Sequence, residues 1–166
     1  TITDAAGKTL YLETTDTDEP QLIDSVTLDE KGRFRFRREA HSYPAFYRLR
    51  LGESFIPFAA DSVTHLTLSA SGKDLFSTYT IESGDEANKQ IREIGQLRTA
   101  TDKAIEAILT QLNNGTLDRG IALARIDSLS TQLKNILTSK YIFSDPKGAA
   151  AYYALFQSYL GGTYFS

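Results

Sequence analysis

The side chains best suited to chemistry at neutral pH are the two histidines of this 166-residue chain, His41 and His65. His65 closely follows Asp61 and Ser62, so a Ser–His–Asp hydrolytic group can be drawn on paper. Such a group needs a fixed three-dimensional geometry, which neighbours within one short segment rarely supply. We therefore expect both histidines to lie in surface turns, and an enzyme ranks third among the interpretations below.

The chain lacks the residues that usually build cofactor and metal sites. The chain has no cysteine, which removes thiolate nucleophiles, disulfides and thiolate metal ligands. A single histidine without further ligands makes a poor metal site, and no glycine-rich loop of the phosphate-binding kind is present. The sequence therefore predicts a non-catalytic chain that holds no metal and no cofactor.

Arginine is concentrated in two neighbouring segments, residues 31–38 and 44–51, where it alternates with aromatic and aliphatic residues. If these segments pair as a hairpin, their arginines share one face of a sheet. The candidate partner-binding residues are Arg33, Arg35, Arg37, Arg48 and Arg50. This face is predicted either to bind an anionic partner or, as we favour, to be neutralised by acids from neighbouring elements, since the net charge is −3.

The first half of the chain must position these arginines, and its pattern is typical of β-structure. β-Branched and aromatic residues alternate with polar ones, and turn residues recur at short intervals. Strands are expected near residues 10–12, 23–28, 33–37, 44–51, 55–58, 66–68 and 79–81. Residues 1–82 are therefore predicted to form an antiparallel β-sandwich or curled sheet, with a barrel as the open alternative.

The periodicity becomes helical at Ser83, which together with Glu86 has the form of a capping box. The expected helices run from Ser83 to Asn113–Gly115, from Thr116 or Asp118 onward, and from Asp145–Pro146 to Gly161–Gly162. Residues 83–166 are therefore predicted to form an antiparallel helical hairpin and a third short helix, which makes the fold class α+β. The apolar stripes of the long helices face either the core of the chain, which we favour, or a second copy.

Composition and chain ends suggest a fragment of a longer protein. There is no methionine, and the chain ends on the apolar sequence Tyr164-Phe165-Ser166. We expect the original N-terminus to be missing, and a removed export signal agrees with this. No apolar run reaches the ~20 residues of a membrane span, and the mild charge gives no reason to expect nucleic-acid binding.

Six segments together resemble one known family. They are Gly7–Leu12, Ile23–Asp29, Gly32–Phe36, Pro44–Leu49, Ile81–Gly84 and Asp145–Phe156. In this order they resemble an N-terminal domain of unknown function that precedes the thioredoxin-like domain in exported thiol–disulfide oxidoreductases of Gram-negative bacteria. The resemblance spans nearly the whole chain, although each segment is short.

The resemblance implies that redox chemistry belongs to a CxxC pair in a C-terminal domain that this cysteine-free chain lacks. It implies an exported parent, periplasmic or anchored in the cell envelope, with membrane contact only through a lipid anchor. The expected partners are proteins, namely the missing C-terminal domain, a substrate protein or a second copy. We therefore expect a non-catalytic accessory module for docking or self-association. The alternative is an independent β-module that binds an anionic glycan or lipid through the arginine-rich hairpin.

Overall fold

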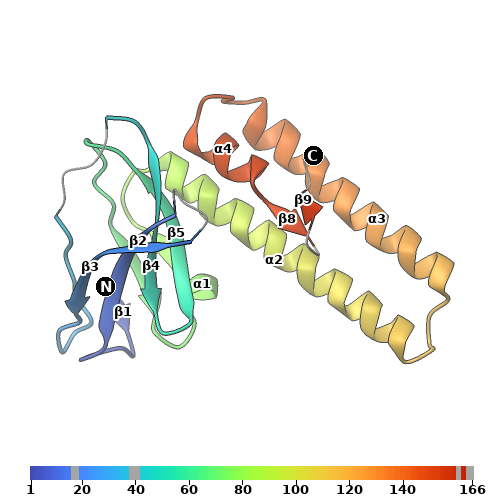
Figure 1. Cartoon of the computed structure of the whole chain (residues 1–166), viewed down its shortest axis with the longest axis horizontal. Coiled ribbons are helices and arrows are strands. Elements are labelled where there is room, and N and C mark those ends of the chain that lie inside the picture. The colour runs from blue at the N-terminus through green and yellow to red at the C-terminus, as the bar shows by residue number, and fades with distance from the viewer. Residues whose placement is uncertain (16–18, 38–41, 160–161, 164–166) are drawn as a thin grey trace. The chain divides into compact units, whose positions relative to one another are not determined.

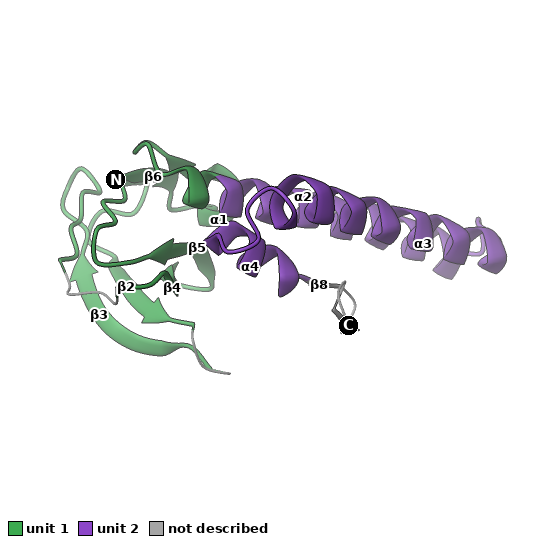
Figure 2. Ribbon diagram, turned by 90° about the horizontal axis from the view of Figure 1, so that it is seen from above, with its two compact units in different colours: residues 1–89 green, residues 90–166 purple. Residues whose placement is uncertain are grey.

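The computed structural model describes residues 1–15, 19–37, 42–159 and 162–163 (Figure 1). The chain forms two compact units, residues 1–89 and residues 90–166 (Figure 2). The first unit contains two open sheets and the second is mainly helical. The fold is therefore α+β, as predicted, and the sheets do not close into a barrel. No described helix is both long enough and apolar enough to cross a membrane.

Four antiparallel strands form the larger sheet of unit 1. They are β2 (Thr9–Thr14), β3 (Gln21–Thr27), β4 (Ala45–Leu51) and β5 (Ser54–Ala60), in the order β3-β2-β4-β5. Period-two alternation gives this sheet one apolar face, on which Leu12, Leu49 and Ile56 lie opposite one another and are buried. The sequence located all four strands correctly.

A smaller sheet combines the beginning of the chain with residues 68–81. Its strands are β1 (Ile2–Thr3), β6 (Leu68–Ser71) and β7 (Thr80–Ile81), and the short helix α1 (Leu75–Thr78) lies between β6 and β7 in the sequence. β6 is antiparallel to β7 but parallel to β1, so the expectation of purely antiparallel pairing is wrong for this sheet. Its strands are only two to four residues long, and such short runs carry little pairing information of their own.

The strand predicted at residues 33–37 is not formed, and this is the main correction to the β region. β4, its expected hairpin partner, lies between β2 and β5, so neither side of β4 is open to another strand. The preceding turn also ties residues 32 and 33 to Ile2 and Asp29 instead of to β4. Gly32 accepts a hydrogen bond from the Ile2 amide at 2.7 Å, and the Asp29 carboxylate accepts one from the Arg33 amide at 2.8 Å.

Helix α2 (Glu86–Asn113) begins at an edge of the larger sheet. The amide of Asn88 bonds both backbone groups of Ala59 in the edge strand β5, accepting from its N–H at 2.8 Å and donating to its C=O at 2.7 Å. Asp85, not the predicted Ser83, accepts from the amide three residues on, that of Asn88, at 2.9 Å. The helix therefore starts at Glu86, and the Ser83 hydroxyl instead accepts from the Thr67 amide.

Unit 2 contains the rest of α2 and the elements that follow it. These are α3 (Arg119–Ile136), the π-helical turn η1 (Leu137–Ile142), α4 (Ala149–Leu155), β8 (Ser158–Tyr159) and β9 (Gly162–Thr163). Asp118, one of the two N-cap candidates that the sequence offered, caps α3 by accepting from the amides of Gly120 and Ile121. Figure 1 shows α3 returning along α2.

Two features of unit 2 differ from the prediction. The third helix begins at Ala149, with Gly148 at its N-cap position, and ends at Leu155 rather than at Gly161–Gly162. The second long helix passes into a π-helical turn at Leu137, where the Phe143 amide donates to the carbonyl of Thr138. The apolar period runs unbroken through this region, so the sequence contains no signal for the change.

Candidate binding groove

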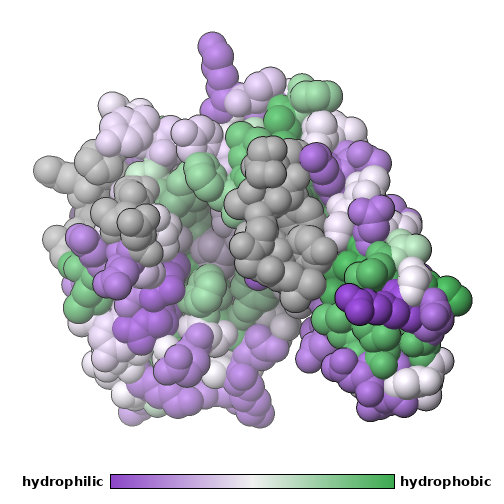
Figure 3. Space-filling model, turned by 45° about the vertical axis from the view of Figure 1, so that its right-hand side comes forward, coloured by the Kyte–Doolittle hydropathy of each residue, from purple (hydrophilic) through white to green (hydrophobic). Residues whose placement is uncertain are grey.

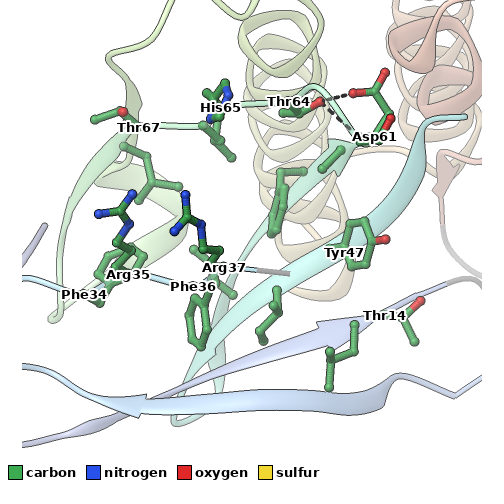
Figure 4. Close-up of a pocket in the computed structure, with 18 of the residues that line it drawn as sticks. Thr14, Phe34, Arg35, Phe36, Arg37, Tyr47, Asp61, Thr64, His65 and Thr67 are labelled. Carbon is green, nitrogen blue, oxygen red and sulfur yellow. Dashed lines mark hydrogen bonds between the residues drawn. The ribbon is translucent and has the colours of Figure 1, made fainter. Parts of the chain in front are cut away.

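A groove of about 1040 Å3 lies in unit 1 on the apolar face of the larger sheet. Its floor includes Leu49 of β4 and the stacked rings of Tyr47 and Phe58, whose centroids are 5.6 Å apart. Two segments outside the strands, residues 34–37 and 64–67, form its walls (Figure 4). The groove is large enough for a peptide segment and has an aromatic floor.

Arg35 and Arg37 lie on one wall of the groove, and both side chains are exposed. Figure 4 shows their guanidinium groups directed toward the segment that carries His65 and Thr67, while the Phe36 ring lies on the opposite side of the backbone. Within the described ranges, neither arginine has an ion pair or a hydrogen bond. The groove therefore has two cations that no described acid neutralises.

Arg48 and Arg50 are neutralised on the other face of the sheet. Their Nε atoms donate to the two carboxylate oxygens of Glu13 at 2.5 and 2.8 Å, and Glu13 is only 5% exposed. The guanidinium of Arg48 lies over the ring of Phe55 and that of Arg50 over the ring of Tyr11. Burial alone raises the pKa of Glu13, but the hydrogen bonds and charges of the two arginines outweigh it and hold that pKa below its ordinary value.

The predicted single arginine face is therefore wrong, because the five residues fall into three groups. Arg33 pairs with Asp29 at 2.7 Å within the turn, and its backbone and side-chain hydrogen bonds lower the pKa of Asp29. Arg48 and Arg50 alternate along β4 with Leu49, which lines the groove, so they point away from it. Only Arg35 and Arg37 remain available at the groove.

The Ser–His–Asp group that the sequence allows, but that we did not expect, is not assembled among the described residues. The Asp61 carboxylate accepts from the Thr64 hydroxyl at 2.7 Å and from the Val63 amide at 3.1 Å, and these bonds lower the pKa of Asp61. Among the described residues His65 has no hydrogen bond, and Figure 4 shows Asp61 bonded to Thr64 instead. His65 is exposed on the groove wall, whereas His41 lies outside the described residues.

The wall at residues 64–67 is the part of the groove that sequence reasoning missed. Its signal is a short alternation, Thr64-His65-Leu66-Thr67, of which only the second half falls in the strand expected at residues 66–68. Among the described residues there is also no group of three or more histidines and carboxylates that could hold a metal ion. The residues that line the groove can supply aromatic contact, positive charge and hydrogen bonds.

No protein-family model, no curated protein and no solved structure matches this chain.

Proposed function

We propose that this chain is a non-catalytic protein-docking module and that the groove of unit 1 is its docking surface. The observation that supports this most strongly is the combination of stacked aromatic side chains with the unneutralised Arg35 and Arg37. Aromatic residues and arginine are the types enriched in the centres of protein interfaces. A docked segment would cover the rings and neutralise the two cations.

The parent that we propose is an exported thioredoxin-like thiol–disulfide oxidoreductase of the periplasm or cell envelope. The support is the resemblance of the six segments given above. On this proposal the chain is a sandwich-like or curled β-domain followed by an antiparallel helical hairpin. In that setting the groove receives a segment of a substrate protein or of the parent's own redox domain.

The helical unit is proposed to serve as a second contact surface. Glu93 near the start of α2 accepts from Lys140 and Tyr141, both at 2.9 Å, which supports an antiparallel arrangement of the two long helices. Apolar side chains gather at the end of this pair that comes forward in Figure 3, and Ile121 and Leu123 are among the exposed ones. They suit self-association or contact with a following domain.

Single-cysteine cross-linking tests the docking function, because the native chain offers no competing thiol. His65→Cys places a benzophenone maleimide at the groove, and Lys103→Cys places the same probe on the exposed surface of α2. Each labelled protein is illuminated with a carboxymethylated, permanently unfolded protein. We expect cross-links from position 65 and few from position 103. Equal yields, or none from position 65, would reject the groove as the docking surface.

The ion pairs weaken the rival proposal, a β-module that binds an anionic glycan or lipid. That proposal needs a continuous cationic face, and three of its five arginines are paired with Asp29 or Glu13. Binding to phosphatidylglycerol vesicles without binding to the unfolded protein would favour the rival.

A further inference from the structure

Two segments on opposite walls of the groove have the exposure pattern of β-strands without the pairing. Exposed and half-buried residues alternate along residues 33–37, and the same alternation runs along residues 64–67. The backbone groups of Phe34 to Arg37, and those of His65 and Leu66, make no hydrogen bond to any described residue. Unpaired N–H and C=O groups along an extended segment are a template for an added strand.

The side chains of residues 33–37 define what such a strand must carry. Arg35 and Arg37 are two residues apart, so along an extended segment they repeat at roughly 6.6 Å. Residues of an added strand that lie opposite them are close enough to form ion pairs if they are acidic. Phe34 and Phe36 turn the other way, pack against the apolar core and have their ring centroids 6.0 Å apart.

We propose that the groove binds an extended peptide segment that adds as a β-strand along residues 33–37 and carries Asp or Glu at every second position. The intervening residues are apolar and lie over the aromatic floor formed by Tyr47 and Phe58. This inference rests on the proposed function, since it names the ligand class of the same groove. Charge complementarity with Arg35 and Arg37 selects an acidic partner over a neutral or basic one.

Three fluorescein-labelled peptides test both parts of the proposal by fluorescence anisotropy. One alternates Glu with Val, one alternates Lys with Val, and the third is the Glu/Val peptide with N-methyl groups on every second backbone amide. We expect the Glu/Val peptide to bind at least roughly tenfold more tightly than either of the others. N-methylation removes the donors that strand addition requires while leaving the charges unchanged.

Charge reversal on the protein provides the matched comparison. Arg35→Glu with Arg37→Glu should abolish binding of the Glu/Val peptide and favour the Lys/Val peptide. The control is Arg119→Glu with Arg125→Glu, which makes the same change in charge at exposed positions of α3 and should leave binding unchanged. All four side chains are exposed, so both variants are expected to fold, and circular dichroism checks this.

Each alternative outcome has a definite meaning. Equal binding of the N-methylated peptide would overturn strand addition, and equal binding of the Lys/Val peptide would overturn the acidic ligand. Cross-links from position 65 that the Glu/Val peptide does not compete away would leave the docking function standing with the wrong ligand class. Absence of those cross-links would reject the docking function itself. Binding to anionic vesicles but to no peptide would replace this proposal by the lipid alternative.

Discussion

Replacing Asn88 by alanine tests how unit 1 closes the edge of its larger sheet. Asn88 is 2% exposed, and its side-chain amide bonds the N–H and the C=O of Ala59, which is itself buried. Asn88→Ala leaves two buried backbone groups without partners, and each costs about 1–3 kcal/mol. Alanine recovers about 0.5 kcal/mol through its higher helix propensity. The expected loss in the free energy of unfolding of unit 1 is therefore about 1.5–5.5 kcal/mol.

Urea denaturation followed by circular dichroism measures this loss, and amide hydrogen exchange locates it. The Ala59 amide should exchange much faster in the variant, because its acceptor is the side chain that has been removed. Lys89→Ala is the matched control, since Lys89 is the next residue of α2 and is exposed. We expect the free energy of unfolding of the control to lie within about 0.5 kcal/mol of that of the unsubstituted chain. A loss below about 1 kcal/mol for Asn88→Ala, with unchanged exchange at Ala59, would refute this account of the sheet edge.

Two further changes probe the turn at Gly32 and the ion pairs of Glu13 with Arg48 and Arg50 in unit 1. Gly32→Ala should lower the free energy of unfolding by about 2–5 kcal/mol, because Gly32 has φ +69° and an added Cβ would lie 1.8 Å from the carbonyl oxygen of Ile2. The control is Gly52→Ala, at φ +61° with no atom of a described residue near the added Cβ. It should cost only about 1–2 kcal/mol in the same urea assay. Glu13 has a lowered pKa when folded, so its contribution to stability is present above its unfolded pKa of about 4.5 and is lost as pH falls through the lower folded value. Glu13→Gln should therefore lower the free energy of unfolding by about 1–3 kcal/mol at neutral pH. It should also weaken the loss of stability on acidification, measured by thermal unfolding as a function of pH. An unchanged pH dependence would contradict the buried ion-pair interpretation.

The sequence did not predict the groove, because the alternation along residues 33–37 was identified correctly but was assigned the wrong neighbouring strand. Alternation along residues 33–37 correctly predicts that Arg35 and Arg37 are exposed and that Phe34 and Phe36 turn inward. It does not identify a neighbouring strand, because alternation describes one segment at a time. β4 has its two neighbours in β2 and β5, and the predicted hairpin had no place in that order.

The arginines of β4 show the same separation between local and long-range information. Their position on the face opposite Leu49 follows from the period of the strand. Their neutralisation by Glu13, which is 35 residues away from Arg48 in sequence, depends on β2 pairing with β4 in one particular register. Glu13 is also buried, which a charged residue in a short strand gives no reason to expect.

The sequence by itself determined the features that depend on a few consecutive residues. These are the four strands of the larger sheet, an N-cap for α3 at Thr116 or Asp118, the turn at Gly115 with φ +70°, and the division into a β-rich half and a helical half. Tertiary structure alone decided the strand order, the parallel pair of β1 and β6, the contact of Asn88 with β5, and the separation of five arginines into three environments. The physical reason is that hydrogen-bond geometry and side-chain period act over a few residues, whereas the choice between competing strands and counter-ions depends on contacts across the whole unit.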